Sequence, residues 1–128
     1  MISPQQSVFM LCKNTALDVF DGKVYDYLPG KEVAYPFVFI GEQFSNDIVN
    51  KSVIFANVTQ RVHFFHNDFK KRRRISDLVL RYMQAIRGKE EAFKRDFLIK
   101  EMSYRMLTDN TTDTPLMHGV LEIIFLVN

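Results

Sequence analysis

Apolar residues recur at helical spacing in one part of this chain. They fall at i, i+3, i+4, i+7, i+8 and i+11, and are Ile75, Leu78, Val79, Tyr82, Met83 and Ile86. This period predicts an amphipathic helix, with Asn67 and Asp68 as a cap before it and Gly88 at its end. Burying these side chains is worth on the order of 10 kcal/mol before ordering entropy is subtracted. The helix must therefore lie on a sheet or on another helix.

A second helix is predicted near the beginning of the chain. Ser3 is a suitable N-cap, and Pro4 suits the first helical position. An apolar stripe that includes Val8 and Cys12 follows, which predicts a helix from Pro4 to Thr15. Because Cys12 is the only cysteine and lies on this stripe, we expect a small buried hydrophobe and no intrachain disulfide.

Four stretches have the composition of long strands. They are rich in β-branched and aromatic residues, and are Tyr35–Gln43, Ser52–His66, Phe97–Leu107 and His118–Val127. The polar segment Phe44–Lys51 is expected to be a loop. Asn110–Pro115 contains the residues that favour turns, so we expect it to join the last two strands as a hairpin.

These elements predict the fold class. A length of 128 residues suits one domain, residues 1–128. We expect an α+β fold, with an antiparallel sheet of about four strands and two α-helices packed on one face. Two of the strands are apolar on both faces, so the uncovered face needs a partner subunit. The candidate residues for this subunit interface are Phe37, Phe39, Val120 and Ile124.

Charge and composition limit the possible partners. Seventeen basic and fifteen acidic residues give a net charge of +2, too small to imply nucleic-acid or membrane binding by itself. No apolar run reaches about 18 residues, so we expect no membrane span. The single cysteine fits folding in a reducing cytoplasm.

The charge is concentrated in one basic run. Its residues are consecutive at the start of the predicted helix, and are Lys70, Lys71, Arg72, Arg73 and Arg74. Cations at a helix N-terminus oppose the helix dipole by roughly 0.3–1 kcal/mol each. The run is therefore either a solvated helical turn or a surface compensated by acidic groups of another subunit or by nucleic-acid phosphate.

The residues that carry catalysis or bind metals form no recognisable site. His63 and His66 are three apart, which on a strand places them on opposite faces, and no cysteine or carboxylate pattern completes a metal site. We expect His63 at the surface, His66 at a strand end, and His118 at the surface or an edge. No nucleophile elbow, phosphate loop or dinucleotide motif is present. We therefore expect no catalytic residue, metal or cofactor; an enzyme acting through His63 or His118 is the least favoured alternative.

Several motifs together resemble one family. The segments Gly22–Pro29, Tyr35–Glu42, Val62–His66 and Gly119–Val127 are similar in order and spacing to segments of the phage tail-completion, or tail-terminator, proteins that join heads to tails in long-tailed phages. The resemblance runs from about Gly22 to Val127, and each motif alone is weakly specific. The dense run Lys70–Arg74 is not a mark of that family.

The resemblance implies a function as well as a fold. It implies two helices on an antiparallel sheet, and a hexameric ring that caps the tail tube with DNA passing through its lumen. The implied partners are copies of the chain, the tail tube protein and the head-connector or stopper protein. The implied location is the neck of the virion, after assembly in the host cytoplasm, and no catalytic residue or cofactor comes with the family. The alternatives are a neck or head-completion adaptor and, less favoured, a small DNA-binding module that uses Lys70–Arg74.

Overall fold

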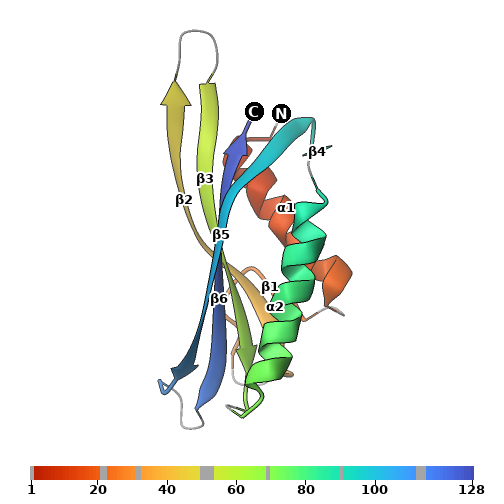
Figure 1. Cartoon of the computed structure of the whole chain (residues 1–128), viewed down its shortest axis with the longest axis vertical. Coiled ribbons are helices and arrows are strands. Elements are labelled where there is room, and N and C mark those ends of the chain that lie inside the picture. Colours follow the sequence, from red (N-terminus) through yellow and green to blue (C-terminus); the bar gives the residue numbers. More distant parts are fainter. Residues whose placement is uncertain are drawn as a thin grey trace.

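The computed structural model describes residues 2–20, 23–30, 33–49, 54–68, 70–89, 91–111 and 115–128. Figure 1 shows the elements of this part, which in chain order are α1 (Pro4–Val19), β1 (Val24–Tyr25), β2 (Phe37–Val49), β3 (Ile54–His66), α2 (Arg72–Arg87), β4 (Glu91–Ala92), β5 (Arg95–Asp109) and β6 (Leu116–Val127). Neither helix in these ranges is long and apolar enough to cross a membrane.

The strands form one curled sheet in the order β1-β2-β3-β6-β5-β4 (Figure 1). β1 runs parallel to β2, and the other neighbours are antiparallel. The prediction of about four antiparallel strands with two helices on one face is therefore wrong, because the sheet of the described residues has six strands and is mixed. The reason is that β1 and β4 have two residues each. Strands of that length leave no period in the sequence and form only where a loop reaches a sheet edge.

β2 also continues further than predicted. The segment Phe44–Lys51 was expected to be a loop, but β2 passes a bulge between Ile40 and Gln43 and stays paired with β3 as far as Val49. Residues 50–53 lie outside the described part of the chain. Backbone pairing does not require apolar side chains, so a polar strand end gives no hydrophobic signal.

α1 begins as predicted and ends later. The Oγ of Ser3 accepts a hydrogen bond from the backbone N–H of Gln6 at 3.0 Å, and the helix runs to Val19 instead of ending at Thr15. Thr15 is itself buried, and its hydroxyl donates to the carbonyl four residues earlier at 2.7 Å. Cys12 is fully buried, which raises the pKa of its thiol to about 12 and confirms the prediction of a buried hydrophobe.

α2 confirms the strongest period in the sequence. Its buried positions are Ile75, Val79, Tyr82 and Ile86, and Gly88 follows its last residue. The predicted cap is wrong, because the N-cap is Lys71, which makes no side-chain cap bond. Asp68 instead accepts a hydrogen bond from the backbone N–H of Lys70 at 2.9 Å, in the turn that precedes the helix.

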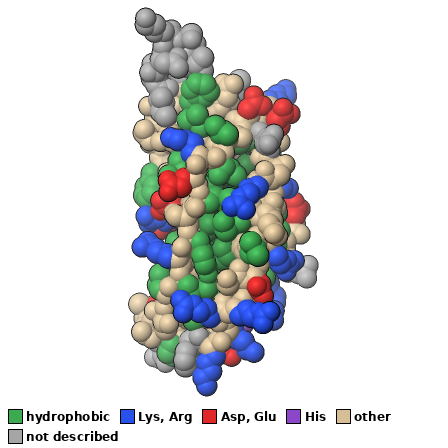
Figure 2. Space-filling view, viewed as in Figure 1, with side chains coloured by type: hydrophobic (Ala, Val, Ile, Leu, Met, Phe, Trp, Pro, Cys, Tyr) green, Lys and Arg blue, Asp and Glu red, His purple; other side chains and the backbone are tan. Residues whose placement is uncertain are grey.

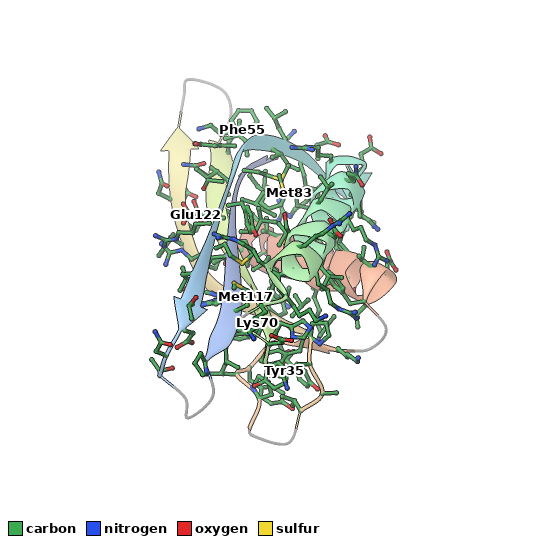
Figure 3. All side chains as sticks on the ribbon, turned by 60° about the horizontal axis from the view of Figure 1, so that its bottom comes forward. Tyr35, Phe55, Lys70, Met83, Met117 and Glu122 are labelled. Atoms are coloured by element: carbon green, nitrogen blue, oxygen red, sulfur yellow. The ribbon has the colours of Figure 1, made fainter. Side chains whose placement is uncertain are left out.

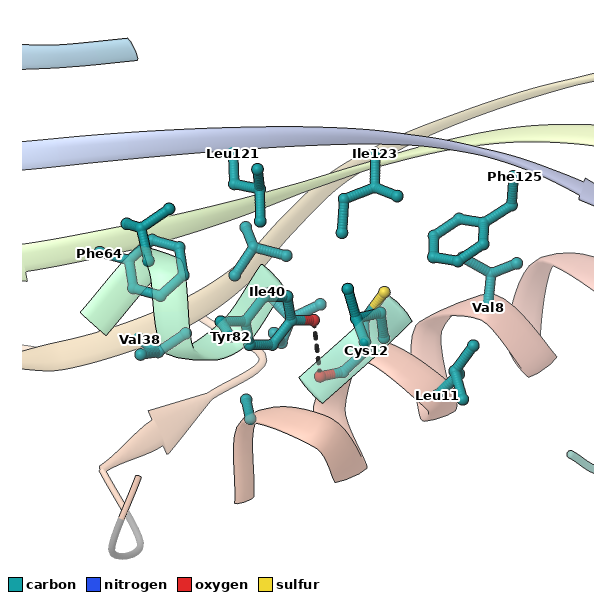
Figure 4. Close-up of a cluster of buried hydrophobic side chains, with 14 of the residues drawn as sticks. Val8, Leu11, Cys12, Val38, Ile40, Phe64, Tyr82, Leu121, Ile123 and Phe125 are labelled. Carbon is teal, nitrogen blue, oxygen red and sulfur yellow. Dashed lines mark hydrogen bonds between the residues drawn. The ribbon is translucent and has the colours of Figure 1, made fainter. Parts of the chain in front are cut away.

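The core lies between the helices and the sheet. α1 and α2 contact each other and pack against β2, β3 and β6; we call the face that they contact the inner face. Figure 4 shows the buried side chains there, where the hydroxyl of Tyr82 donates to the carbonyl of Cys12 at 3.0 Å. A Cβ at Gly119 would lie 3.0 Å from Cγ2 of Ile75, so the glycine lets α2 lie close to β6.

Candidate functional site

The face of the sheet opposite the helices, here the outer face, carries an ionic network across its middle. Arg61 on β3 donates from Nε to Oε2 of Glu122 on β6 at 2.9 Å, and from Nη1 to Oε2 of Glu42 on β2 at 3.3 Å. Arg61 and Glu122 are direct partners in the ladder between β3 and β6. These side chains are half-buried, and together they link three adjacent strands through charged groups.

A pair of histidines extends this network along the outer face. Nε2 of His63 lies 2.6 Å from Oε1 of Glu42, and Nδ1 of His63 lies 2.8 Å from Nε2 of His118. A carboxylate can only accept, so Nε2 of His63 donates to Glu42, while Nδ1 of His63 and Nε2 of His118 share one hydrogen bond whose direction depends on the tautomer. The expectation of a surface His63 is wrong, since the residue is only 9% exposed between the bulge of β2 and the neighbouring strand β6.

Burial and charge shift two groups of this network. Burial, followed by the charge of His63, lowers the pKa of His118 to about 4. Partial burial acts to raise the pKa of Glu42, but hydrogen bonds that include those from His63 and Arg61 lower it below its usual value. At neutral pH the network therefore holds an ionised Glu42 and an uncharged His118.

The chemistry available to this network is limited. In the described residues, no serine, threonine or cysteine is hydrogen-bonded to His63 or His118. His66 ends β3, and its Nδ1 accepts from the backbone N–H of Asp68 at 3.1 Å. Across the same described ranges, no group of three or more histidine, cysteine or acidic side chains is placed to hold a metal ion. The arrangement satisfies polar groups between strands and offers no nucleophile.

One end of the outer face is covered by the chain itself. An aromatic cluster there contains buried Phe37, Phe65 and Leu116, packed with Tyr25, Val33, Tyr35 and Phe39. The rings of Tyr35 and Phe37 lie 5.2 Å apart, and those of Tyr25 and Phe37 lie 5.8 Å apart. The segment that precedes β2 therefore folds back over the end of the sheet.

The aromatic cluster reduces the exposed apolar surface of the residues that the sequence suggested for a subunit interface. Phe37 and Val120 are only 4% and 6% exposed within the single chain. Phe39 and Ile124 are partly buried. Since ion pairs occupy the middle of the same face, the uncovered apolar surface there is smaller than the sequence implied.

The five residues of the basic run are all exposed. Lys71 is the N-cap of α2, and the three arginines form its first turn, where no acidic residue offsets them. Figure 3 shows Lys70 towards the same end of the molecule as Tyr35 and Met117, whereas Phe55 lies at the other end. In Figure 2 several Lys and Arg side chains gather at this lower end. The run is thus presented as one surface beside the start of α2.

A stripe of apolar side chains lies between α2 and β5 and is visible along the middle of Figure 2. We call it the β5 stripe; it consists of partly buried Met83, Ile99, Met102 and Met106 and exposed Leu80 and Tyr104. Among the described strands, the edge of β5 that faces away from β6 is paired only at Arg95 and Asp96, where β4 lies beside it. Methionine side chains adapt readily to a partner surface.

Comparison with known proteins shows the family to which the chain belongs. No protein-family model matches it. It is 30% identical over 102 residues to the tail completion protein gp17 of Bacillus phage SPP1, an alignment that covers 78% of this chain and 73% of that protein. The chain belongs to the phage tail completion proteins. The expectation drawn from the sequence motifs is therefore confirmed at the level of the family.

Solved structures share the fold of this tail completion protein. The structure of SPP1 gp17 matches with a TM-score of 0.58 at 23% identity, over 94% of this chain and 89% of that one. A chain of the virion of a native gene transfer agent particle matches with a TM-score of 0.54 at 13% identity, over 97% and 95% of the two chains. These matches show a shared fold, and membership of the family gives the protein a structural role in tail completion.

Sequence reasoning missed two surfaces of this tail completion protein. The β5 stripe could have been predicted, because Met102, Tyr104 and Met106 occupy alternate positions of β5 and therefore lie on the same face of the sheet. The histidine network has no sequence pattern that predicts it, since Glu42, His63 and His118 meet only when β2, β3 and β6 become neighbours.

Proposed function

We propose that the protein is one subunit of a hexameric ring that caps the tail tube and joins the tail to the head connector, with DNA passing through the lumen. The observation that carries this proposal is the 30% identity to a tail completion protein over most of both chains. Its partners would be further copies of the chain, the tail tube protein and the head-connector or stopper protein. The outer-face network links neighbouring strands through hydrogen bonds and ion pairs, which supports a structural role.

Electron microscopy of particles that lack the protein tests the proposal. Tails of uncontrolled length would support a terminator, because nothing would then stop growth of the tube. Tails of normal length that never join heads would favour the alternative, a neck or head-completion adaptor. Normal, infectious particles without the protein would contradict both roles.

Within this proposal the basic run faces the lumen or a partner. Repeated around a ring, five exposed cations per copy would form a positive band, which suits DNA phosphate or an acidic partner surface. Reversing the charges of Arg72, Arg73 and Arg74 to glutamate should leave folding intact, because all three are exposed, but should lower the yield of infectious particles. The control is Lys94→Glu, an exposed cation that precedes β5 at the other end of the sheet. Equal titres for the two variants would mean that the run is merely solvated.

A further inference from the structure

Both margins of the sheet end in unpaired backbone. On β2, β1 pairs only with Val38 and Phe39, which leaves the edge beyond the bulge without a neighbour among the described strands. β5 likewise has no neighbour among the described strands along its free edge beyond Asp96. The two edges lie at the same level, because one row of paired residues runs across the sheet from Gln43 on β2 to Met102 on β5. A long free edge is a template for pairing with another strand.

The strand directions allow one copy to extend the next. β2, β3, β6 and β5 alternate in direction across the sheet. A second copy in the same orientation would therefore bring its β2 antiparallel to this β5 without being turned over. Repetition of such a head-to-tail contact closes into a ring when each step adds a rotation.

The side chains at the two margins are complementary. On the inner face the β5 margin offers the β5 stripe, where Leu80 is 51% exposed, and the β2 margin offers exposed Asp47, whose partner in the ladder is buried Ala56. Phe44, also 51% exposed, lies on the outer face, where the guanidinium of Arg61 lies 5.0 Å above its ring. Arg72 lies within electrostatic reach of Tyr104 in the stripe, and Arg87 lines a hollow beside it together with Phe97, Leu98 and Ile99. On the β2 margin the acidic side chain of Asp47 would face these arginines, whereas Glu42 is already paired with Arg61 and His63 on the outer face. If the β5 stripes of two copies packed against each other instead, Arg72 and Arg87 of one copy would face the same arginines of the other, and like charges would repel.

We propose that the β5 edge and β5 stripe of one copy receive the β2 edge of a second copy, so that the sheet continues from subunit to subunit around the ring. The inference rests on the proposed ring and names the surfaces that close it. Because ion pairs occupy the middle of the outer face and the aromatic cluster covers one end of it, the contact between copies runs through the margins of the sheet.

Sedimentation of purified full-length variants tests the contact. Leu80→Glu changes the β5 margin and Asp47→Arg changes the β2 margin, and each should weaken self-association about tenfold or more. Leu80→Glu would bury a carboxylate in an apolar contact, and Asp47→Arg would set a cation against Arg72 and Arg87. Leu17→Glu is the matched control, because Leu17 is 45% exposed on α1 and belongs to neither margin; it should associate like the unmodified chain. Circular dichroism checks folding, and Leu80→Gln replaces Leu80→Glu if the latter does not fold.

Mixing the two margin variants makes the test specific. Each variant keeps one intact margin, so a one-to-one mixture should give pairs and no rings. If Leu80→Glu forms rings as the unmodified chain does, the ring stands and this contact is overturned. If Asp47→Arg associates like the unmodified chain while Leu80→Glu is impaired, a stripe-to-stripe contact replaces it. An unmodified chain that stays monomeric, alone and with tail tubes, overturns the ring and this contact together.

Discussion

Replacing Gln60 with leucine should destabilise the fold through the bulge of β2. Gln60 is fully buried on β3, and its Nε2 donates to the carbonyls of Gly41, Glu42 and Arg61 at 3.1, 3.2 and 3.1 Å. Its Oε1 accepts from Nε2 of Gln43 at 2.9 Å. Leucine has a similar volume, so no cavity forms, but carbonyls of the bulge lose their buried donor. With about 1–3 kcal/mol for each unsatisfied buried group and partial relaxation, we expect a loss of about 2–4 kcal/mol.

Urea unfolding followed by circular dichroism measures this loss. With a slope of about 2 kcal/mol per molar urea, the midpoint should fall by about 1–2 M. Gln5→Leu is the control, because the hydrogen bond from Nε2 of Gln5 to the hydroxyl of Ser45 is exposed to solvent, so the midpoint should hardly move. A loss below about 1 kcal/mol for Gln60→Leu would show that water or a rearranged bulge satisfies these carbonyls, and would refute the reasoning.

Three further changes have directions that the structure fixes. Ser3→Ala removes the N-cap bond of α1 and should cost about 1 kcal/mol, whereas Ser3→Asn should restore most of it in the same urea assay. Gly41→Ala places a Cβ 2.8 Å from Cδ2 of His63, which is held at both ring nitrogens, and should cost about 1–3 kcal/mol; Gly88→Ala, whose nearest atom is 3.7 Å away, should not destabilise, and equal losses would contradict this reasoning. The lowered pKa of His118, about 4 against 6.5 when unfolded, means that its contribution to stability is complete above about pH 6.5 and is lost as the pH falls towards 4. Between about pH 7 and about pH 5, the free energy of unfolding should therefore fall less for His118→Gln than for the unmodified chain. An equal fall for the two proteins would disprove the assignment to His118.

Local patterns were sufficient for the long elements of the fold. The period from Ile75 to Ile86 required a helix, and Ser3 with Pro4 placed the start of α1, because capping and amphipathic spacing act within a few residues of the chain. The long strands were visible for the same reason, although β2 extended into a segment without an apolar pattern. The family was also visible, since its motifs keep their order and spacing along the chain.

What the sequence alone determined was therefore which segments become helices and long strands, and the family to which they belong. Only the tertiary structure decided the two short edge strands, the burial of His63 and the cover over Phe37. The physical reason is distance along the chain: His63 and His118 are 55 residues apart and meet only because β3 pairs with β6. Burial of a side chain depends on which strand becomes its neighbour, and the spacing of apolar residues within one segment carries no information about that choice.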